Sequence, residues 1–212
     1  MNPTFDSACR RCARLASFLD SVRLDEPQYY CRPVPPFGDG SARIIMVGLA
    51  PGMHGANRTG RPFTGDHAGI LLYRTLHKFG FATEPVSTSA DDGLRLLDLR
   101  ITNAVKCLPP ANKPLPKEIK ECNGYLREEL EQSRDARVIL ALGTIAHAAV
   151  LRAHDLPAGR FRFAHAAEHA LPKDRVLLDS YHCSRYNTQT RRLTTEMFES
   201  VIARARALAF AK

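Results

Sequence analysis

Four of the six cysteines in the sequence fall into two spaced pairs that could bind a metal. Cys9 and Cys12 form a C-x-x-C, and Cys107 and Cys122 enclose a proline-rich segment. Four thiolates from two such pairs suit a tetrahedral zinc ion or an iron–sulfur cluster. The long second spacing favours the cluster, because structural zinc sites usually contain two tight pairs. The alternative is that the C-x-x-C is a coincidence and that Cys107 and Cys122 are buried thiols.

A glycine-rich loop over residues 48–69 is the most unusual segment of the chain. It has neither the G-K-[ST] of a P-loop nor the G-x-G-x-x-G of a dinucleotide-binding fold, and it could be only a loop with several turns. It also carries two cations, Arg58 and Arg61, the flat apolar ring of Phe63, and the carboxylate of Asp66. Together these side chains resemble parts of a site for a planar ligand that bears phosphate.

His182 is the third candidate for chemistry. In a functional role it would donate a proton or a hydrogen bond to a developing negative charge. In a structural role it would be a histidine with satisfied hydrogen bonds. Polar residues follow it closely: Ser184, Arg185, Asn187 and Thr188.

Other metal-binding or nucleophilic side chains are not indicated. Four further histidines are expected on helices or surface loops, without a convincing metal-binding pair: His147, His154, His165 and His169. Cys31 and Cys183 have no spaced partner, and a nucleophilic role for Cys183 beside His182 is disfavoured. The sequence also lacks the carboxylate cluster that metal-dependent nucleotide hydrolysis requires.

The elements that must position these residues alternate between strands and helices. Short apolar runs predict four strands, over residues 43–48, 97–105, 137–143 and 175–182. Amphipathic spacing predicts five helices, over residues 7–24, 67–79, 116–133, 144–153 and 193–211. Connections of this length imply a single α/β domain over residues 1–212, with a mainly parallel sheet of about four strands and helices on both faces. Because the carboxyl ends of parallel strands share one edge, the glycine-rich loop, Asn103 and His182 can meet there.

Composition narrows the class of protein. The chain has 212 residues, and its 30 Lys and Arg against 22 Asp and Glu give a net charge of +8, which favours a polyanionic partner. Its ordinary globular composition excludes a disordered chain. No apolar run is long enough for a membrane span, and the N-terminus lacks the layout of a signal peptide. We therefore expect a cytoplasmic protein without membrane association, in which disulfides are disfavoured.

Several motifs occur in an order that resembles a known family. They are GLAPG at 48–52, NRTGRPFTGD at 57–66, ITNAVKC at 101–107, ALGTIAH at 141–147 and YHCSRYNTQTRRLT at 181–194. Over nearly the whole chain they resemble the uracil-DNA glycosylases, most closely the family-5 type of the iron–sulfur branch. Two positions differ from related patterns. Cys183 stands where the last motif has proline. Leu49 stands where the family-4 type has Glu, and the lack of this Glu is typical of family 5.

The resemblance implies a DNA repair enzyme that hydrolyses the N-glycosidic bond of uracil and leaves an abasic site. Phe63 would stack on the flipped base, and Asn103 would bind its Watson–Crick edge. His182 would stabilise negative charge on the leaving base, and Asp66 would position water and balance positive charge on the sugar. Further base contacts would come from the first motif: Gly48, Leu49, Ala50 and Gly52. The DNA backbone would be contacted by Arg58, Arg61, Ser184, Arg185, Asn187 and Thr188.

The resemblance also implies a cofactor and a partner. Cys9, Cys12, Cys107 and Cys122 would hold a [4Fe–4S] cluster, with zinc as the alternative occupant. The partner would be DNA containing deaminated bases, with hypoxanthine or xanthine as further candidates beside uracil, and the protein is expected to be a monomer. The rival hypothesis is a noncatalytic nucleic-acid-binding or damage-sensing protein with the same fold and cluster.

Overall fold

The middle of the sheet is built from short apolar runs that are buried on both faces. The computed structural model describes residues 5–211, and four parallel strands form the centre of its sheet. These strands are β2 (Ile44–Gly48), β3 (Leu99–Asn103), β4 (Val138–Leu142) and β6 (Arg175–Ser180). Every residue of β2 and β4 is buried, as expected for strands covered on both sides. The predicted α/β class and mainly parallel sheet are confirmed.

The sheet has six strands rather than about four, because a short antiparallel strand is added at each edge. β1 (Phe37–Gly38) pairs with β3 and β5 (Glu168–Leu171) pairs with β6, which gives the order β1-β3-β2-β4-β6-β5. Neither edge strand has a strong sequence signal. β1 is two residues long, and β5 has two polar residues among its four and is partly exposed.

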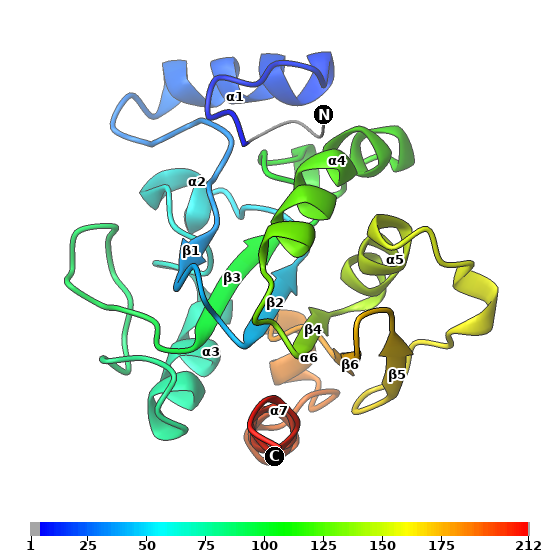
Figure 1. Cartoon of the computed structure of the whole chain (residues 1–212). Helices are drawn as coiled ribbons and strands as arrows, with labels where there is room; N and C mark the ends of the chain where they lie inside the picture. Colours follow the sequence, from blue (N-terminus) through cyan, green and yellow to red (C-terminus); the bar gives the residue numbers. More distant parts are fainter. Residues whose placement is uncertain (1–4, 212) are drawn as a thin grey trace.

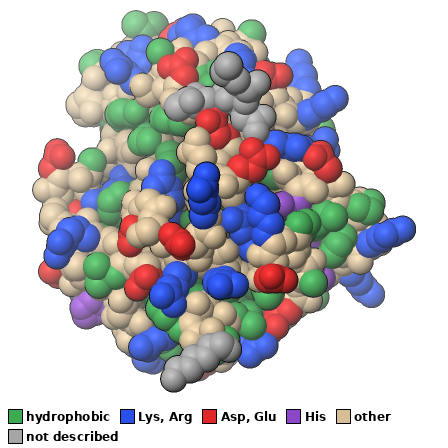
Figure 2. Space-filling view, in the orientation of Figure 1, with side chains coloured by type: hydrophobic (Ala, Val, Ile, Leu, Met, Phe, Trp, Pro, Cys, Tyr) green, Lys and Arg blue, Asp and Glu red, His purple; other side chains and the backbone are tan. Residues whose placement is uncertain are grey.

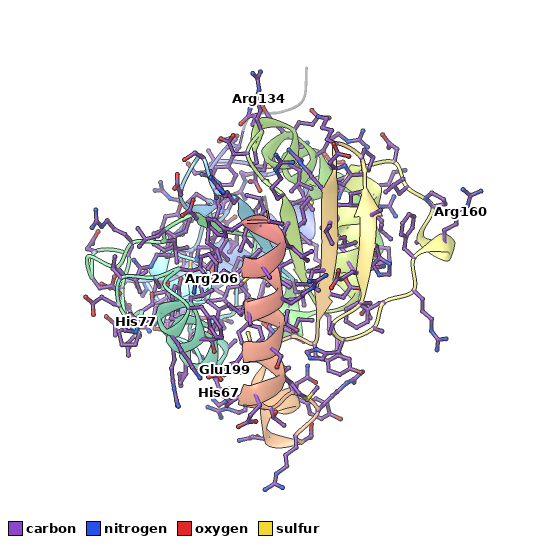
Figure 3. All side chains as sticks on the ribbon, turned by 60° about the horizontal axis from the view of Figure 1, so that its bottom comes forward. His67, His77, Arg134, Arg160, Glu199 and Arg206 are labelled. Atoms are coloured by element: carbon purple, nitrogen blue, oxygen red, sulfur yellow. The ribbon has the colours of Figure 1, made fainter. Side chains whose placement is uncertain are left out.

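Helices cover both faces of the sheet, as predicted (Figure 1). On one face α3 (His67–Lys78) and α7 (Thr195–Ala209) pack in one apolar core with Ile44 and Met46. On the other face α4 (Pro116–Gln132) and α5 (Thr144–Ala153) pack in a second core with Ile45 and Val47. The alternating residues of β2 thus serve two cores, because successive side chains of a strand point to opposite faces. Figure 3 shows α7 running alongside the strands of the sheet, with His67 near its N-terminal end.

The N-terminal helix begins later than predicted. α1 spans Ala13–Asp25, and the C-x-x-C lies in the turns before it. The backbone N–H of Ala8 donates to the Asp6 carboxylate at 2.7 Å, so Asp6 closes a turn and does not cap a helix at residue 7. Short helical segments absent from the prediction occur in four connections: α2 (Ala56–Thr59), η1 (Pro110–Asn112), η2 (Ala158–Arg160) and α6 (Arg185–Gln189).

The surface gives no simple marker of a binding face. Figure 2 shows Lys and Arg side chains interspersed with Asp and Glu over the face in view. The net charge of +8 is therefore not gathered into one patch on that face. Within residues 5–211 no helix has the length and apolar character needed to span a bilayer.

Candidate active site

A cavity of about 460 Å³ opens at the carboxyl ends of the parallel strands. The structure brings together there many of the residues singled out from the sequence, although they come from segments far apart in the chain. The lining includes Leu49, Ala50, Gly52, Phe63, Asp66, Asn103, His182, Ser184 and Arg185. This is the position where ligands bind in open α/β sheets.

Asn103 lies at the floor of the cavity, at the end of β3. Its side chain is only 3% exposed, and its Oδ1 has no hydrogen-bond partner among the described residues. Gly48 is its neighbour across the β2–β3 ladder, and a Cβ at Gly48 would lie 2.4 Å from Asn103 Oδ1 and 2.8 Å from Phe63 Cζ. Only glycine fits there, so Gly48 lies beneath the cavity and lets the amide and the ring meet. A buried acceptor without a partner in the protein is rare, and at this position it is available to accept from a ligand or a water molecule.

Phe63 provides one flat wall of the cavity. Its ring centroid lies 5.7 Å from that of His182, with the two planes inclined by 32°. Its backbone has the left-handed φ of 54°, which is costly for a side chain of this size. The neighbouring helix α3 approaches this backbone closely, since a Cβ at Gly69 would lie only 1.9 Å from the Phe63 carbonyl oxygen. A glycine at position 69 is therefore needed for the loop to take this path.

Asp66 faces the cavity from the N-terminus of α3. Its Oδ1 accepts a hydrogen bond from the Gly69 N–H at 2.9 Å and so caps the helix. Its Oδ2 faces the turn that contains Gly55, where an added Cβ would lie 2.4 Å away. Burial raises the pKa of the Asp66 carboxyl, against the lowering effect of the backbone N–H groups of Gly69 and Ala68. The carboxylate is therefore kept in place and poorly hydrated, as expected for a group that acts on water or on a cation.

His182 faces Phe63 across the cavity, just after β6. Loss of hydration lowers the pKa of His182 to about 4, so the ring is neutral near pH 7. Of the two functions open from the sequence, this favours a hydrogen-bond donor over a cationic proton donor. The Asn187 side chain donates to the His182 carbonyl oxygen at 2.8 Å. Asn187 therefore holds the turn after His182 with one of its amide hydrogens.

The comparisons with known proteins agree with this geometry. A family model described as the uracil DNA glycosylase superfamily matches residues 35–206.

The chain belongs to this superfamily.

By family it is a DNA glycosylase, a hydrolase of N-glycosidic bonds. A curated relative in Thermus thermophilus, named type-5 uracil-DNA glycosylase, is 48% identical over 96% of this chain and 94% of its own length. Another of the same name in Pyrobaculum aerophilum is 42% identical over 94% of this chain and 88% of its own. A type-4 uracil-DNA glycosylase of Archaeoglobus fulgidus is 39% identical over only 58% of this chain and 54% of its own. The resemblance to the type-5 glycosylases is confirmed.

One cation of the glycosylase motif lies away from the surface. Arg61 is 4% exposed, and its guanidinium pairs with Asp92 and donates to Ser87 and Thr64. The expectation that it contacts DNA does not fit this placement, because its donors are used inside the protein. Arg61 instead ties the glycine-rich loop to the segment that follows α3. Arg58 and Arg185 are exposed near the mouth of the cavity.

Several residues near the cavity were not singled out from the sequence. Thr144 and Ile145 line it from the start of α5, and Asn112 lines it from η1. The only feature of the sequence that could have indicated these residues is their position directly after a predicted strand or in the loop that follows one. Tyr186 lies beside Arg185 in α6, and its side chain is 69% exposed, which is unusual for a large aromatic. Tyr186 lies inside the last motif, and its aromatic side chain could have marked it as a candidate in the sequence.

Cys183 is neither a surface thiol nor a nucleophile in this glycosylase. It is fully buried in the core formed with α3 and α7, and burial raises the pKa of its thiol. The turn that a proline would stiffen is held by Asn187 instead. Thr188, also expected at DNA, has its hydroxyl 3.0 Å from His67 Nε2, so it ties α6 to α3 at the rim.

The four paired cysteines line one small cavity between α1, α4 and the loop after β3, and they pack in one cluster with Tyr125. Burial and the neighbouring thiolates raise the pKa of Cys12 to about 11. Arg14 on α1 donates to Glu118 on α4 at 2.7 Å and so joins the helix that follows the C-x-x-C to the helix that carries Cys122. Four sulfurs around one cavity are the donor set of a [4Fe–4S] cluster or of a tetrahedral zinc ion.

A buried ion pair with α4 lies between Cys107 and the end of β3, where Asn103 is. Lys106 is 1% exposed, and its ammonium lies 2.7 Å from Glu129 of α4 and donates to Thr102. Thr102 also donates to Glu129 at 2.6 Å. Lys106 precedes Cys107, and Thr102 precedes Asn103, so the two sites share a rigid connection.

Proposed function

We propose that this chain removes uracil from DNA by hydrolysing its N-glycosidic bond and leaves an abasic site. The observation that carries the proposal is the buried, unpartnered Oδ1 of Asn103 in a cavity walled by Phe63 and His182. A flipped base would enter this cavity and stack on Phe63. Its N3–H would donate to Asn103 Oδ1, and the Asn103 amide N–H would donate to its O4. The names of the type-5 relatives support this substrate.

The chemistry would be divided between Asp66 and His182. As the glycosidic bond breaks, positive charge grows on the sugar and negative charge on the base. The Asp66 carboxylate would balance the first and orient the attacking water, and the neutral His182 would donate a hydrogen bond to the second. His182 is suited to this because its lowered pKa removes the competing cationic form.

We further propose that hypoxanthine and xanthine are substrates. Both present the same N–H beside a carbonyl that uracil presents, so a single amide at Asn103 serves all of them. A cavity of about 460 Å³ has room for two fused rings.

DNA would approach over the mouth of the cavity, where Arg58, Ser184 and Arg185 lie. Thr188 would contribute at the rim. The exposed ring of Tyr186 is suited to stack against bases beside the gap that a flipped nucleotide leaves. Monomeric state and cytoplasmic location stay predictions.

The deciding assay measures base release from matched duplexes that carry uracil, hypoxanthine, xanthine or a thymine mispair. We expect release of uracil and of the two deaminated purines, and no release of thymine. Binding to these duplexes without release of any base would favour the noncatalytic alternative. Release of uracil alone would contradict only the wider substrate range.

Replacing Asn103 by Ala tests the base-recognition role. We expect kcat/KM for uracil to fall about 100-fold, because the paired N–H and carbonyl of the base lose their partners. The melting temperature should stay near the wild-type value, since the substitution removes an acceptor that has no partner in the protein. A large fall in melting temperature with unchanged kcat/KM would show that the amide is structural.

We also propose that Cys9, Cys12, Cys107 and Cys122 hold a [4Fe–4S] cluster. The four side chains line one small cavity. The long spacing between Cys107 and Cys122 favours the cluster over zinc, because structural zinc sites usually contain two tight pairs of cysteines. When bound, the cluster would link α1 to the loop after β3 and hold the latter in place.

Metal analysis tests the cluster. We expect iron and acid-labile sulfide in the purified protein, at about four of each per chain. Cys122→Ser should lose most of the iron and lower the melting temperature, whereas Cys31→Ser should keep the iron, because Cys31 is buried outside this cavity. A colourless protein that holds zinc would contradict the assignment.

A further inference from the structure

A second group of metal-ligating side chains lies outside the cavity, on the opposite side of β6. His147 on α5, His169 on β5 and Asp179 on β6 converge there. His147 Nδ1 lies 2.8 Å from Asp179 Oδ1, and His169 Nε2 lies 3.2 Å from Asp179 Oδ2. Within residues 5–211 this is the one set of three or more such side chains whose ligand atoms all lie within 4.8 Å. His147 lies on a helix, as expected, whereas His169 lies on strand β5 and not on a helix or loop.

The three side chains are buried, so an unbalanced charge on any of them would destabilise the folded state. The Asp179 side chain is fully buried, that of His147 is 5% exposed and that of His169 is 14% exposed. The backbone of Asp179 is held on both sides, since its N–H donates to Ala167 and its carbonyl accepts from Ala166. A carboxylate taken out of water at such a site is stabilised by a cation beside it, either a protonated histidine or a metal ion.

The hydrogen bonds of His147 show where that cation would lie. Its Nε2 is 3.0 Å from the carbonyl oxygen of Phe161, which can only accept, so Nε2 carries a hydrogen. In the neutral ring Nδ1 is then a lone pair, and it points at a carboxylate oxygen 2.8 Å away. Two acceptors at this distance repel unless a proton or a metal ion lies between them. The bond from Nε2 to a backbone carbonyl is also the usual second contact of a metal-bound histidine.

We propose that His147, His169 and Asp179 bind a divalent transition-metal ion of the zinc class. Two imidazoles and one carboxylate are a frequent ligand set for such ions, with the fourth position left for water. Ligand atoms around a tetrahedral ion with bonds near 2.0 Å lie roughly 3.3 Å apart. The two histidine–aspartate separations are 2.8 and 3.2 Å and all ligand atoms lie within 4.8 Å of one another, so small side-chain shifts would complete the geometry. His169, the least buried of the three, gives the ion its route from the surface.

The bound ion would act on stability and not on base release. It would join one helix and two strands at the outer edge of the sheet, next to the segment that ends in the exposed η2 turn, where Arg160 projects outwards (Figure 3). None of the three residues lines the catalytic cavity. The site thus does not depend on the proposed substrate.

The test uses the purified protein with its cysteine-bound group intact, after chelator dialysis to remove loosely bound ions. Zinc is titrated by calorimetry, and cobalt(II) is added separately to record its absorption spectrum. We expect about one zinc ion per chain to bind at this site and a higher melting temperature when zinc is present. Cobalt should give the spectrum of nitrogen and oxygen ligation, without the intense bands of thiolate ligation.

His169→Ala should weaken zinc binding by at least tenfold and remove the thermal shift, and Asp179→Asn is a second variant of similar shape. His77→Ala is the matched control, because His77 is an exposed histidine on α3 far from the group in sequence and fold, and it should bind zinc as the wild type does. Equal zinc affinity in the wild type and His169→Ala would overturn the proposal. So would an NMR spectrum, recorded with zinc present, in which both ring nitrogens of His147 carry hydrogen. If both variants fail to fold, the cobalt spectrum of the wild type alone decides: thiolate bands or no bands overturn the site.

Discussion

Asp66→Asn is expected to slow uracil release by about 10²–10⁴-fold while leaving the fold intact. Asn keeps the shape of the side chain and an oxygen that can accept from the Gly69 N–H, so the cap of α3 survives. It removes the negative charge that the sugar needs as the bond breaks. The raised pKa of Asp66 means that its ionised form is disfavoured by burial, so losing the charge should not lower stability at pH 7. Single-turnover release of uracil and thermal melting measure the two effects.

Asp66→Ser is the companion variant, because Ser is also a good helix cap but has no carboxylate. Both variants should melt near the wild-type temperature and both should bind uracil-containing duplex. Wild-type release rates in both would remove Asp66 from the mechanism. Loss of rate together with unfolding in both would show instead that the carboxylate is needed as a cap.

His182→Ala is expected to lower the release rate by about 10²–10³-fold, the effect of removing one preorganised donor to a developing negative charge. His67→Ala is the matched control, since His67 also lines the cavity but its ring is bonded to Thr188 at the rim. We expect His67→Ala to change the rate much less. Equal losses in the two variants would contradict a specific role for His182.

The pH dependence of the wild-type release rate distinguishes the role of Asp66 from that of His182. Because the pKa of His182 is lowered to about 4, its neutral form persists from pH 8 to below pH 5, and no loss of rate should be centred near the ordinary value of 6.5. The fall at acid pH should follow protonation of Asp66, whose pKa is raised above its usual 3.8. Asp66→Asn should lose this limb, and His182→Ala should keep it. A fall of the wild-type release rate centred near pH 6.5 would contradict the lowered pKa of His182.

Much of the fold could be predicted because the central strands are buried on both faces and therefore appear as continuous apolar runs. The helix over Thr144–Ala153 agrees with its prediction at both ends. β5 and α6 could not be predicted, because the first is a polar edge strand and the second is a single turn in a polar segment. The residues of the cavity could be named through motifs, since each follows a strand end. Which of these residues are buried could not be predicted. Arg61 lies in a motif that suggests a phosphate contact, but its guanidinium forms an internal ion pair with Asp92.

The group of His147, His169 and Asp179 was missed for a different reason. Asp179 lies within an apolar run that predicts a strand, and nothing in that run marks its carboxylate as special. The two histidines are on separate elements, and their approach depends on how α5 packs against the β5–β6 edge. Contacts of this kind follow from tertiary packing and have no local pattern.

The buried pair of Lys106 and Glu129 has a consequence for how this enzyme would fail. Asn103 is fixed on one side by the ladder to β2, and the segment that follows it is fixed to α4 through Lys106. Disorder caused by damage at the cysteines would therefore stop at Lys106, before it reached Asn103, whose amide is proposed to bind the base. An oxidised chain would then lose thermal stability before it lost base release, so a thermal melt would be an early indicator of oxidative damage and an activity assay a late one.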